Sequence, residues 1–452
     1  MLFERITSEG LAHYSYLVAD GYDALVIDPR RDCDIYVDKT AGQGFRLKYI
    51  LETHRNEDYV VGSVELAART GAEIWHADAH LDYQYGRAIQ DGQTWQVGAL
   101  KVQAIHTPGH TLGSMSYLIH DPQGSPWAVC TGDALFAGDV GRVDFLGMDR
   151  APEMAGRLYD AIFGRLLPLG DEVLVCPAHG SGSACGSGIV DRTWTTIGIE
   201  RKRNPRLQFG TRDAFVANNA RRLEKPPYFA KMEELNLVGG PLLGALPMPT
   251  PLTPPDFRAA MAGATVLDVR SELSYSAATV PGALSIWLQG LPSFGGWMLS
   301  YDQPILLVGD SDEAALATRY LIRMGYDDIA GYLAGGLHEW HKVGYDSQST
   351  QTVTVPQLCG LLDHHGEPHI LDVRKPAELA GGNHIPGAQH IPLSQLPGRL
   401  GEVPKDRPVY ILCGSGFRAM VAASLLQRAG WENAVVVLGG MAAWNSTTCP
   451  LT

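Results

Sequence analysis

The sequence has no long hydrophobic run and no cluster of basic residues. A stretch of roughly 18 apolar residues, which would span a bilayer, does not occur, and the N-terminal MLFERITSEG carries charges where a signal peptide needs an apolar segment. The formal net charge of -13 opposes binding to nucleic acid or to an anionic membrane surface. We therefore expect a cytoplasmic protein with no membrane partner and no nucleic-acid partner.

Cysteines are few, and their spacing is irregular. The 7 cysteines in 452 residues form neither the even set of a disulfide-rich domain nor the close pairs of a zinc ribbon. With 45% hydrophobic and 19% charged residues, the composition is that of an ordinary globular protein. Since a single core stops growing near about 250 to 300 residues, the chain must contain more than one domain.

The second half of the sequence contains an internal repeat. Leu-Asp-Val-Arg occurs at 267–270 and again at 371–374, and Pro-Gly-Ala follows at 281–283 and 386–388. Both copies contain Gly-Gly-x-x-x-Trp near their C-terminal end. Two copies at one constant offset indicate a duplicated domain rather than a solenoid.

A proline-rich segment precedes the repeat. Between Gly239 and Asp256 the prolines oppose a helix or an inner strand, so we expect an interdomain linker. We accordingly predict three domains, which span residues 1–246, 254–346 and 350–452.

In the N-terminal half, short apolar runs predict buried strands, and a polar side chain follows four of them. These side chains are His54, His110, Asp133 and His179. Ligands gather at the carboxyl ends of strands in α/β sheets, so we expect them to share one site. Two imidazoles and one carboxylate form the facial triad of non-haem Fe(II) oxygenases, although the same groups also bind zinc or manganese. His54, His110 and Asp133 are the predicted metal ligands.

Four motifs in this half occur in the order of a known family. They are Thr53-His-Arg-Asn-Glu-Asp-Tyr59, Thr107-Pro-Gly-His110, Thr131-Gly-Asp133 and Pro177-Ala-His179. Together they resemble the metallo-β-lactamase family, and this resemblance implies an αββα sandwich. Asn56 and Tyr59 replace two histidines of the family's His-x-His-x-Asp-His motif, so we do not expect a complete dinuclear zinc site.

The retained residues favour a different member of that family. His54, His110 and Asp133 occupy the positions that hold iron in persulfide dioxygenases, so the resemblance implies one non-haem Fe(II) per chain. Asp58, His179 and Tyr59 are then expected beside the metal ligands. There they either form hydrogen bonds within the pocket or belong to a residual second metal site or a proton relay.

The repeated half resembles rhodanese domains in its Asp-Val-Arg, Pro-Gly-Ala and Gly-Gly-x-x-x-Trp motifs. In the second copy a strand ends at Cys413, and a helical stretch follows Arg418. A helix N-terminus favours a thiolate or a bound persulfide anion, so Cys413 is the predicted nucleophile. Arg418 is expected to steer sulfite or thiosulfate. The predicted sulfur-binding loop is Gly414, Ser415, Gly416 and Phe417.

The first copy lacks the nucleophile. Gly309 stands where the second copy has Cys413, and Asp310, Asp312 and Glu313 follow it. Acidic side chains oppose an anion-binding loop, so we predict a catalytically inactive rhodanese-like domain with a structural role.

The combined prediction is an α/β protein in which an αββα metallo-β-lactamase sandwich is followed by two α/β rhodanese-like domains. The resemblance implies that a low-molecular-weight persulfide is oxidised by O2 to sulfite, and that Cys413 transfers sulfane sulfur to or from sulfite or thiosulfate. Two alternatives stay open, namely a glyoxalase II-like thioester hydrolase, which needs two metals, and a noncatalytic sulfur-carrier scaffold. The persulfide carrier, the direction of transfer and a homo-oligomeric state stay open as well.

Overall fold

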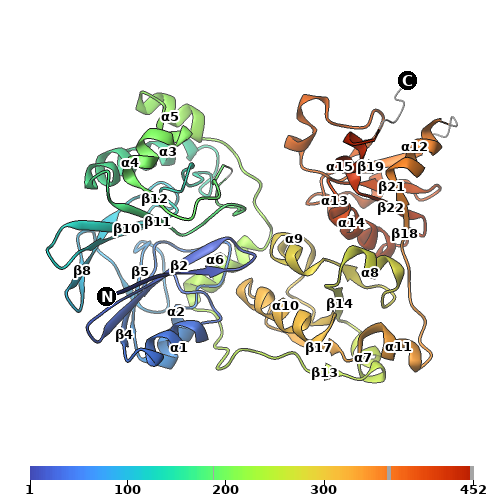
Figure 1. Ribbon diagram of the computed structural model, residues 1–452, viewed down its shortest axis with the longest axis horizontal. Helices are drawn as coiled ribbons and strands as arrows, with labels where there is room; N and C mark the ends of the chain where they lie inside the picture. Colours follow the sequence, from blue (N-terminus) through green and yellow to red (C-terminus); the bar gives the residue numbers. More distant parts are fainter. Residues whose placement is uncertain (187, 364–367, 448–452) are drawn as a thin grey trace. The chain divides into compact units, whose positions relative to one another are not determined.

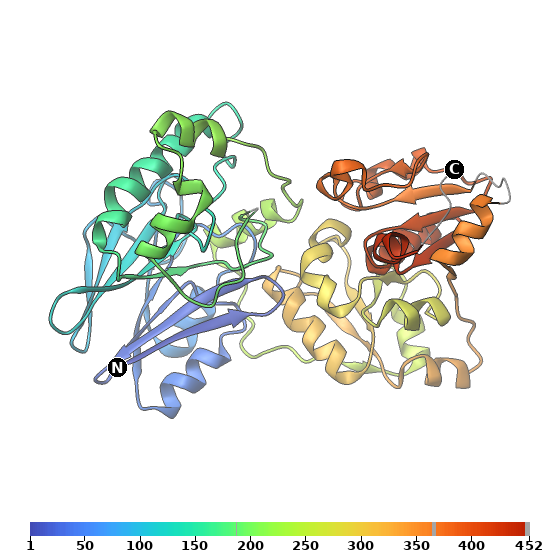
Figure 2. The same ribbon diagram turned by 45° about the horizontal axis from the view of Figure 1, so that its top comes forward.

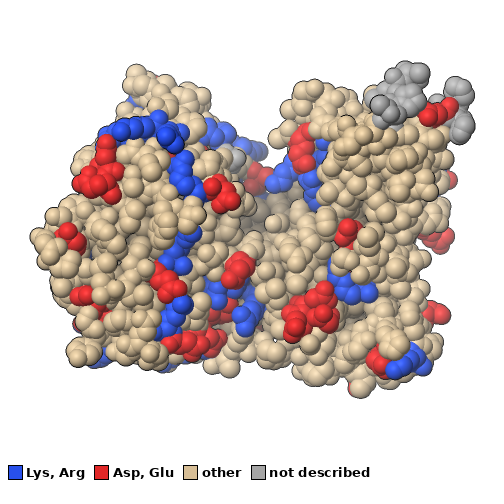
Figure 3. All heavy atoms as spheres, viewed as in Figure 1, with Lys and Arg blue, Asp and Glu red and all other residues tan. Residues whose placement is uncertain are grey.

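Two compact units make up the chain. The computed structural model describes residues 1–186, 188–363 and 368–447, and it separates Met1–Leu246, with Ile322–Gly325, from the rest (Figure 1). Within the described ranges, every helix is too short or too polar to cross a bilayer. On the face seen in Figure 3, acidic and basic side chains are interspersed, unlike the basic stripe of a nucleic-acid-binding surface.

The first unit contains two six-stranded sheets. Their strand orders are β1-β2-β3-β4-β5-β6 and β12-β11-β10-β9-β8-β7. The first sheet comprises β1 (Leu2–Ser8), β2 (His13–Asp20), β3 (Asp23–Ile27), β4 (Arg46–Leu51), β5 (Glu73–His76) and β6 (Arg87–Ala88). The second comprises β7 (Thr94–Val97), β8 (Leu100–His106), β9 (Met115–His120), β10 (Pro126–Gly132), β11 (Leu174–Pro177) and β12 (Thr195–Thr196).

These sheets pack face to face. Val18 and Leu25 of the first sheet share a buried cluster with Val102 and Tyr117 of the second. Helices α1 and α2 cover the outer face of the first sheet, and α3 and α5 cover that of the second. Strand β9 is buried along its whole length, because both of its faces are covered. The four layers confirm the predicted αββα sandwich.

The helices of the first unit are α1 (Asp34–Gly42), α2 (Ser63–Thr70), α3 (Ala151–Ala161), α4 (Ile197–Arg203), α5 (Arg212–Asn219) and α6 (Phe229–Val238), with short helical turns at Ile162–Leu166, Leu167–Leu169 and Pro205–Leu207.

The second unit contains two five-stranded parallel sheets, one for each copy of the repeat. Their strand orders, β13-β17-β16-β14-β15 and β18-β22-β21-β19-β20, are equivalent, which confirms the duplication. The first comprises β13 (Pro251–Leu252), β14 (Thr265–Asp268), β15 (Leu284–Ser285), β16 (Ile305–Val308) and β17 (Ile329–Leu333). The second comprises β18 (Gln351–Thr354), β19 (His369–Asp372), β20 (Gln389–His390), β21 (Val409–Leu412) and β22 (Ala434–Leu438).

Helix α14 of the second copy lies beside α8 and β15 of the first copy (Figure 2). The backbone N–H of Ser285 donates to the hydroxyl of Ser424 on α14 over 3.1 Å. The helices of the second unit are α7 (Pro254–Ala260), α8 (Glu272–Ala277), α9 (Leu291–Met298), α10 (Ser311–Arg323), α11 (Gly336–Lys342), α12 (Val355–Asp363), α13 (Leu396–Arg399), α14 (Phe417–Arg428) and α15 (Gly440–Asn445), with short turns at Leu288–Gly290, Pro376–Gly382 and Leu400–Glu402.

The proline-rich linker ends earlier than the sequence predicts. Pro251–Leu252 forms the edge strand β13, which pairs with β17, and α7 begins at Pro254 with the side chain of Thr253 as its cap. An edge strand and a first helical turn both tolerate proline, because neither needs the missing N–H. The ordered part of the first copy therefore begins before residue 254.

Candidate metal centre and sulfur-binding loop

Four buried side chains converge at strand ends of the first unit. His54 follows β4, His110 follows β8 and Asp133 follows β10, and Glu57 joins these three predicted ligands. Nε2 of His110 lies 3.0 Å from Oε1 of Glu57 and 3.5 Å from Oδ2 of Asp133. Nε2 of His54 lies 3.7 Å from Oε2 of Glu57 and 3.9 Å from Oδ2 of Asp133. All four residues are at most 2% exposed.

Hydrogen bonds on the far side of each imidazole set its orientation. Nδ1 of His54 lies 2.8 Å from the hydroxyl of Thr53, which donates its own proton to Asp28 over 2.7 Å. Nδ1 of His54 must therefore be the donor to Thr53. Nδ1 of His110 donates to the backbone carbonyl of Arg142 over 3.0 Å. Both rings consequently direct Nε2, the nitrogen that could bind a metal, into the site, as metal-bound histidines do.

The atoms that face the centre lack hydrogen-bond partners. Nε2 of His54, Nε2 of His110 and Oδ2 of Asp133 are all buried without a hydrogen bond of regular geometry, and their close neighbours are the other members of the same group. Buried polar atoms without partners cost free energy, which a bound cation would offset. Imidazole nitrogens and carboxylate oxygens suit a divalent first-row metal. The residues therefore fit a metal ion.

Electrostatic coupling within the group is strong. Burial alone would raise the pKa of Glu57, but His110 and His54 outweigh it and lower this pKa to about 2. Burial alone would lower the pKa of His110, but Glu57 and Asp133 outweigh it and raise this pKa to about 9. The pKa of Asp133 is lowered against burial by His179 and His110. Two ionised carboxylates thus face the position where a cation fits.

Glu57 was missed by the sequence interpretation. It occupies a variable position between Asn56 and Asp58, and the family motif assigns it no role. The available signal was an acidic residue three positions after His54, in a loop that returns toward the strand end.

Asp58 and His179 lie against the predicted metal ligands. Nδ1 of His179 is 2.7 Å from Oδ1 of Asp133, and its Nε2 is 2.9 Å from Oδ2 of Asp58. Cys185 completes a second group with Asp58 and His179, in which all ligand atoms lie within 4.8 Å of one another. Its thiol also donates to Oε1 of Glu57 over 3.4 Å.

Cys413 lies between β21 and α14 in the second copy. Its side chain is buried, and Sγ accepts a hydrogen bond of 3.1 Å from the backbone N–H of Gly416. The backbone carbonyls of Cys413 and Gly414 accept hydrogen bonds from the first amides of α15. Gly416 has a φ of 118°, which only glycine adopts readily. The strand–loop–helix arrangement around Cys413 is the predicted one.

Arg418 does not face the thiol as an unpaired cation. Its guanidinium forms two hydrogen bonds with the carboxylate of Glu378, of 2.6 and 2.8 Å. These bonds, outweighing partial burial, lower the pKa of Glu378 to about 2. An anion attracted by Arg418 would therefore also meet the negative charge of Glu378. Phe417 packs on Trp287 of the first copy, with ring centroids 5.0 Å apart.

The corresponding loop of the first copy is closed by its own side chains. Oδ1 of Asp310 accepts the backbone N–H groups of Asp312 and Glu313 over 2.9 and 2.8 Å. Oε2 of Glu313 accepts the N–H of Asp310 over 2.8 Å. This reciprocal cap uses the amides that would otherwise bind an anion. With Gly309 in place of a cysteine, the loop lacks the thiol of the second copy, and three of its amides are already bonded to its own carboxylates.

Residues 9–179 match the model of the metallo-beta-lactamase superfamily. A probable metallo-hydrolase of Burkholderia pseudomallei is 30% identical over 241 residues, which are 46% of this chain and 78% of that protein. The chain belongs to the metallo-β-lactamase superfamily. Residues 253–343 and 356–447 each match the rhodanese-like domain, so two rhodanese-like domains follow the metallo-β-lactamase domain.

Relatives of the metallo-β-lactamase domain differ in activity. The persulfide dioxygenase ETHE1 of Bos taurus is 27% identical over 47% of this chain and 78% of its own length. The hydroxyacylglutathione hydrolase GloC of Haemophilus influenzae is 28% identical over 42% of this chain and 89% of its own length. A metallo-beta-lactamase crystal structure from Staphylococcus aureus covers 74% of this chain and 99% of its own, with 27% identity and a TM-score of 0.67.

Asn56 and Tyr59, which replace two histidines of the superfamily's first motif, each make specific contacts. The amide nitrogen of Asn56 donates to the carbonyl of His54 over 3.2 Å. The ring of Tyr59 packs on His13, with centroids 4.0 Å apart, and its hydroxyl has no hydrogen-bond partner. Burial raises the pKa of Tyr59 well above its usual value. A phenol that keeps its proton is a poor substitute for a metal-binding histidine.

A cavity of about 110 Å³ opens onto the metallo-β-lactamase centre and is lined by Glu57 and His110. Leu81, Leu112 and Phe145 form its apolar wall. Its polar rim includes Arg55 and Glu233, which form an ion pair of 3.1 Å, together with His80. The volume admits a small substrate or the reactive end of a larger one.

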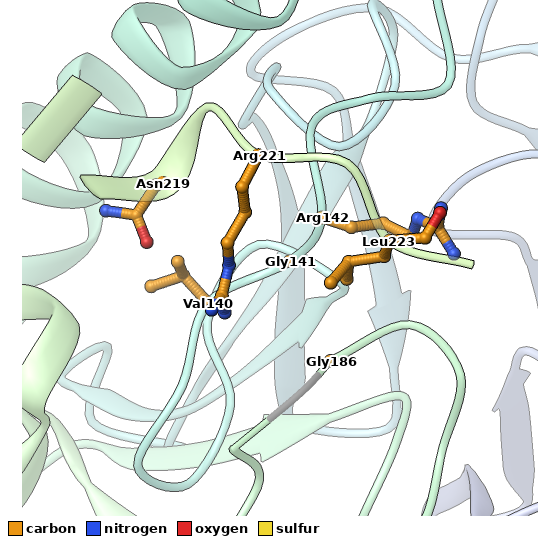
Figure 4. A pocket seen from close by; sticks show the side chains of 7 residues that line it. All are labelled: Val140, Gly141, Arg142, Gly186, Asn219, Arg221 and Leu223. Carbon is orange, nitrogen blue, oxygen red and sulfur yellow. The ribbon is translucent and has the colours of Figure 1, made fainter. Parts of the chain in front are cut away.

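Figure 4 shows a smaller cavity, of about 10 Å³, in the same unit. Arg142, Asn219 and Arg221 line it, and the guanidinium of Arg142 is engaged by Asp144 at 2.7 Å. Its volume suffices for about one water molecule. This space is therefore too small for a substrate.

Proposed function

We propose that the protein is a cytoplasmic persulfide dioxygenase coupled to a sulfurtransferase. The metallo-β-lactamase domain oxidises a low-molecular-weight persulfide to sulfite and thiol with Fe(II) and O2. Cys413 transfers sulfane sulfur to or from sulfite or thiosulfate. The observation that carries the proposal is the buried group of His54, His110 and Asp133, whose inward atoms have no partners.

The balance of the first reaction defines what the site must do. The outer sulfur of the persulfide loses four electrons to O2, water supplies the third oxygen of sulfite, and one proton is released beside the thiol. Bound iron would supply a redox-active centre at which two small molecules meet. His54, His110 and Asp133 would hold it, while Thr53 and the carbonyl of Arg142 fix the two rings.

The cavity contributes positioning and exclusion of water. Its apolar wall, which includes Phe145 and Leu112, suits the sulfur atoms of a persulfide, and Arg55 at the rim can bind a carboxylate of the carrier. Because the ligands are nearly fully buried, their contact with bulk water is limited.

Sulfur transfer at Cys413 follows from its loop. The thiolate attacks the outer sulfur of thiosulfate, the S–S bond breaks, and sulfite leaves with the electron pair. Cys413 then holds a persulfide anion, whose outer sulfur passes to a thiolate acceptor and regenerates the cysteine. The N–H of Gly416 and the N-terminus of α14 stabilise the anionic sulfur.

Oxygen uptake by the iron-loaded full chain with glutathione persulfide tests the dioxygenase. We expect uptake with sulfite as product, and its loss in His110→Ala. His120→Ala is the matched control, because that ring bonds to Gly124 and Gln103 instead of joining the metal group. Failure of the wild type to consume oxygen would refute the dioxygenase and leave a thioester hydrolase or a sulfur-carrier scaffold.

A thioester hydrolase is the second candidate. The group of Asp58, His179 and Cys185 offers donors for a second metal, and the chain also resembles a hydroxyacylglutathione hydrolase. The replacement of two motif histidines by Asn56 and Tyr59 disfavours it. Metal-dependent hydrolysis of S-lactoylglutathione without oxygen uptake would select the hydrolase.

A further inference from the structure

Glu57 sits between the predicted metal ligands and the cavity. Its side chain is 2% exposed, its oxygens lie 3.0 Å from Nε2 of His110 and 3.7 Å from Nε2 of His54, and it lines the cavity beside His110. No other carboxylate of that cavity belongs to the ligand group formed by the described residues.

We propose that Glu57 is a fourth protein ligand of the metal centre. The proposal rests on the metal site of the proposed function, but not on its reaction. Ligand atoms bound at about 2.1 Å from one ion lie about 3.0 Å apart when adjacent in an octahedron and about 3.4 Å apart in a tetrahedron. Glu57 lies 3.0 and 3.7 Å from the two imidazole nitrogens, and Asp133 lies 3.5 and 3.9 Å from them. Glu57 is therefore at least as close to the imidazoles as the predicted ligand Asp133.

Charge and orientation support this role. Two carboxylates with two neutral imidazoles balance the charge of a divalent cation, whereas three ligands leave one positive charge in a buried site. The thiol of Cys185 donates to Oε1 of Glu57 over 3.4 Å and so limits the rotation of the carboxylate. Outer partners of this kind orient metal ligands.

A fourth ligand also changes the number of open positions. A six-coordinate ion with four protein ligands keeps two, which matches the two small molecules of the proposed reaction. Of the four residues in the group, Glu57 and His110 line the cavity, and Glu57 is the one that carries a negative charge there. Its negative charge disfavours highly charged anions such as thiosulfate relative to a singly charged persulfide.

The competing role for Glu57 is that of a counter-ion to a protonated His110. The two roles differ in what a shorter carboxylate does. Glu57→Asp keeps the charge but withdraws the oxygens by one methylene, so a counter-ion survives this change better than a ligand. Glu57→Gln removes the charge with little change of shape.

Anaerobic titration of the metal-free full chain with Co²⁺, followed by visible absorption, tests the proposal. We expect Glu57→Gln and Glu57→Asp each to weaken Co²⁺ binding by at least about ten-fold and to alter the absorption spectrum. Glu233→Gln is the matched control, since Glu233 lines the same cavity outside the ligand group, and we expect it to change the affinity less than about two-fold. Circular dichroism verifies that each variant is folded.

Wild-type affinity and spectrum in Glu57→Gln would overturn the proposal, and so would a loss confined to Glu57→Gln with Glu57→Asp unchanged. Because the titration needs no turnover, its outcome is separate from the proposed function. Absence of oxygen uptake with an intact Glu57 effect would refute the dioxygenase alone.

Discussion

The predicted metal ligands are oriented by neighbouring residues that do not themselves face the metal site. Thr53 links His54 to Asp28, and the carbonyl of Arg142 holds His110. Each of these bonds selects the tautomer whose Nε2 lone pair faces inward. We therefore expect residues that do not bind the metal to contribute to the metal affinity of the site.

Thr53→Val removes the acceptor of the His54 ring while preserving the shape of the side chain. We expect Co²⁺ affinity to fall by about ten- to hundred-fold, because the ring loses its orientation and tautomer. Thr40→Val is the control, since that hydroxyl bonds only within α1, to the carbonyls of Tyr36 and Val37. Equal affinities for the two variants would contradict this account.

The pairing of Glu378 with Arg418 predicts a dependence of stability on pH. The folded-state pKa of Glu378, about 2, lies below the unfolded value of about 4.3. Its contribution to the free energy of unfolding is thus complete above the unfolded pKa and is lost as the pH falls toward the folded one. Solvent screening keeps it small, because the Glu378 side chain is 36% exposed.

We therefore expect Glu378→Gln to lower the urea midpoint of the rhodanese-like part at pH 6 and to differ less from wild type at pH 3.5. Glu432→Gln, at an exposed glutamate, serves as the control. A difference between wild type and Glu378→Gln that grows on acidification would show that the sign is wrong.

At the scale of elements, the loop that begins at Cys413, the proposed nucleophile, is supported from two sides. Helix α14 begins at Phe417 and α15 begins at Gly440. Gly440 approaches so closely that a Cβ there would collide with the carbonyl oxygen of Cys413. The first amides of α15 also bind the carbonyls of Cys413 and Gly414. The close approach of α15 therefore helps to set the position of the nucleophile.

Gly440→Ala should displace α15 from the loop. We expect a loss of at least about 1 kcal/mol in stability and a several-fold slower transfer of sulfur from thiosulfate to cyanide. Gly360→Ala is the matched control, because a Cβ at Gly360 meets nothing within 4 Å. An unchanged transfer rate in Gly440→Ala would show that α15 does not position Cys413.

At the scale of the whole molecule, the two proposed chemistries reside in different compact units. The metal group belongs to the first unit and Cys413 to the second. Joining them in one chain raises the effective concentration of a shared intermediate.

The two activities should therefore separate by single substitutions. We expect Cys413→Ser to abolish sulfur transfer and to retain most oxygen uptake with glutathione persulfide, and His110→Ala to do the reverse. Both rates are measured on the same iron-loaded preparations. Loss of oxygen uptake in Cys413→Ser would mean that sulfur must pass through Cys413 before oxidation.

The sequence by itself determined the fold class, the duplication and the main candidate residues. His54, His110 and Asp133 could be proposed as ligands because each lies close after the end of a strand, and Cys413 as a nucleophile because strand, loop and helix are contiguous in the chain. These signals are local, since a few neighbouring residues specify the backbone conformation that carries them.

Only the tertiary structure decided which distant side chains meet. Cys185 reaches Glu57, and Glu378 pairs with Arg418, across separations that no local pattern reveals. Glu57 lies beside His54 in the sequence, yet its direction follows from the loop's packing. Such contacts depend on how layers pack and which polar atoms are left to pair inside them, and that is a property of the folded chain.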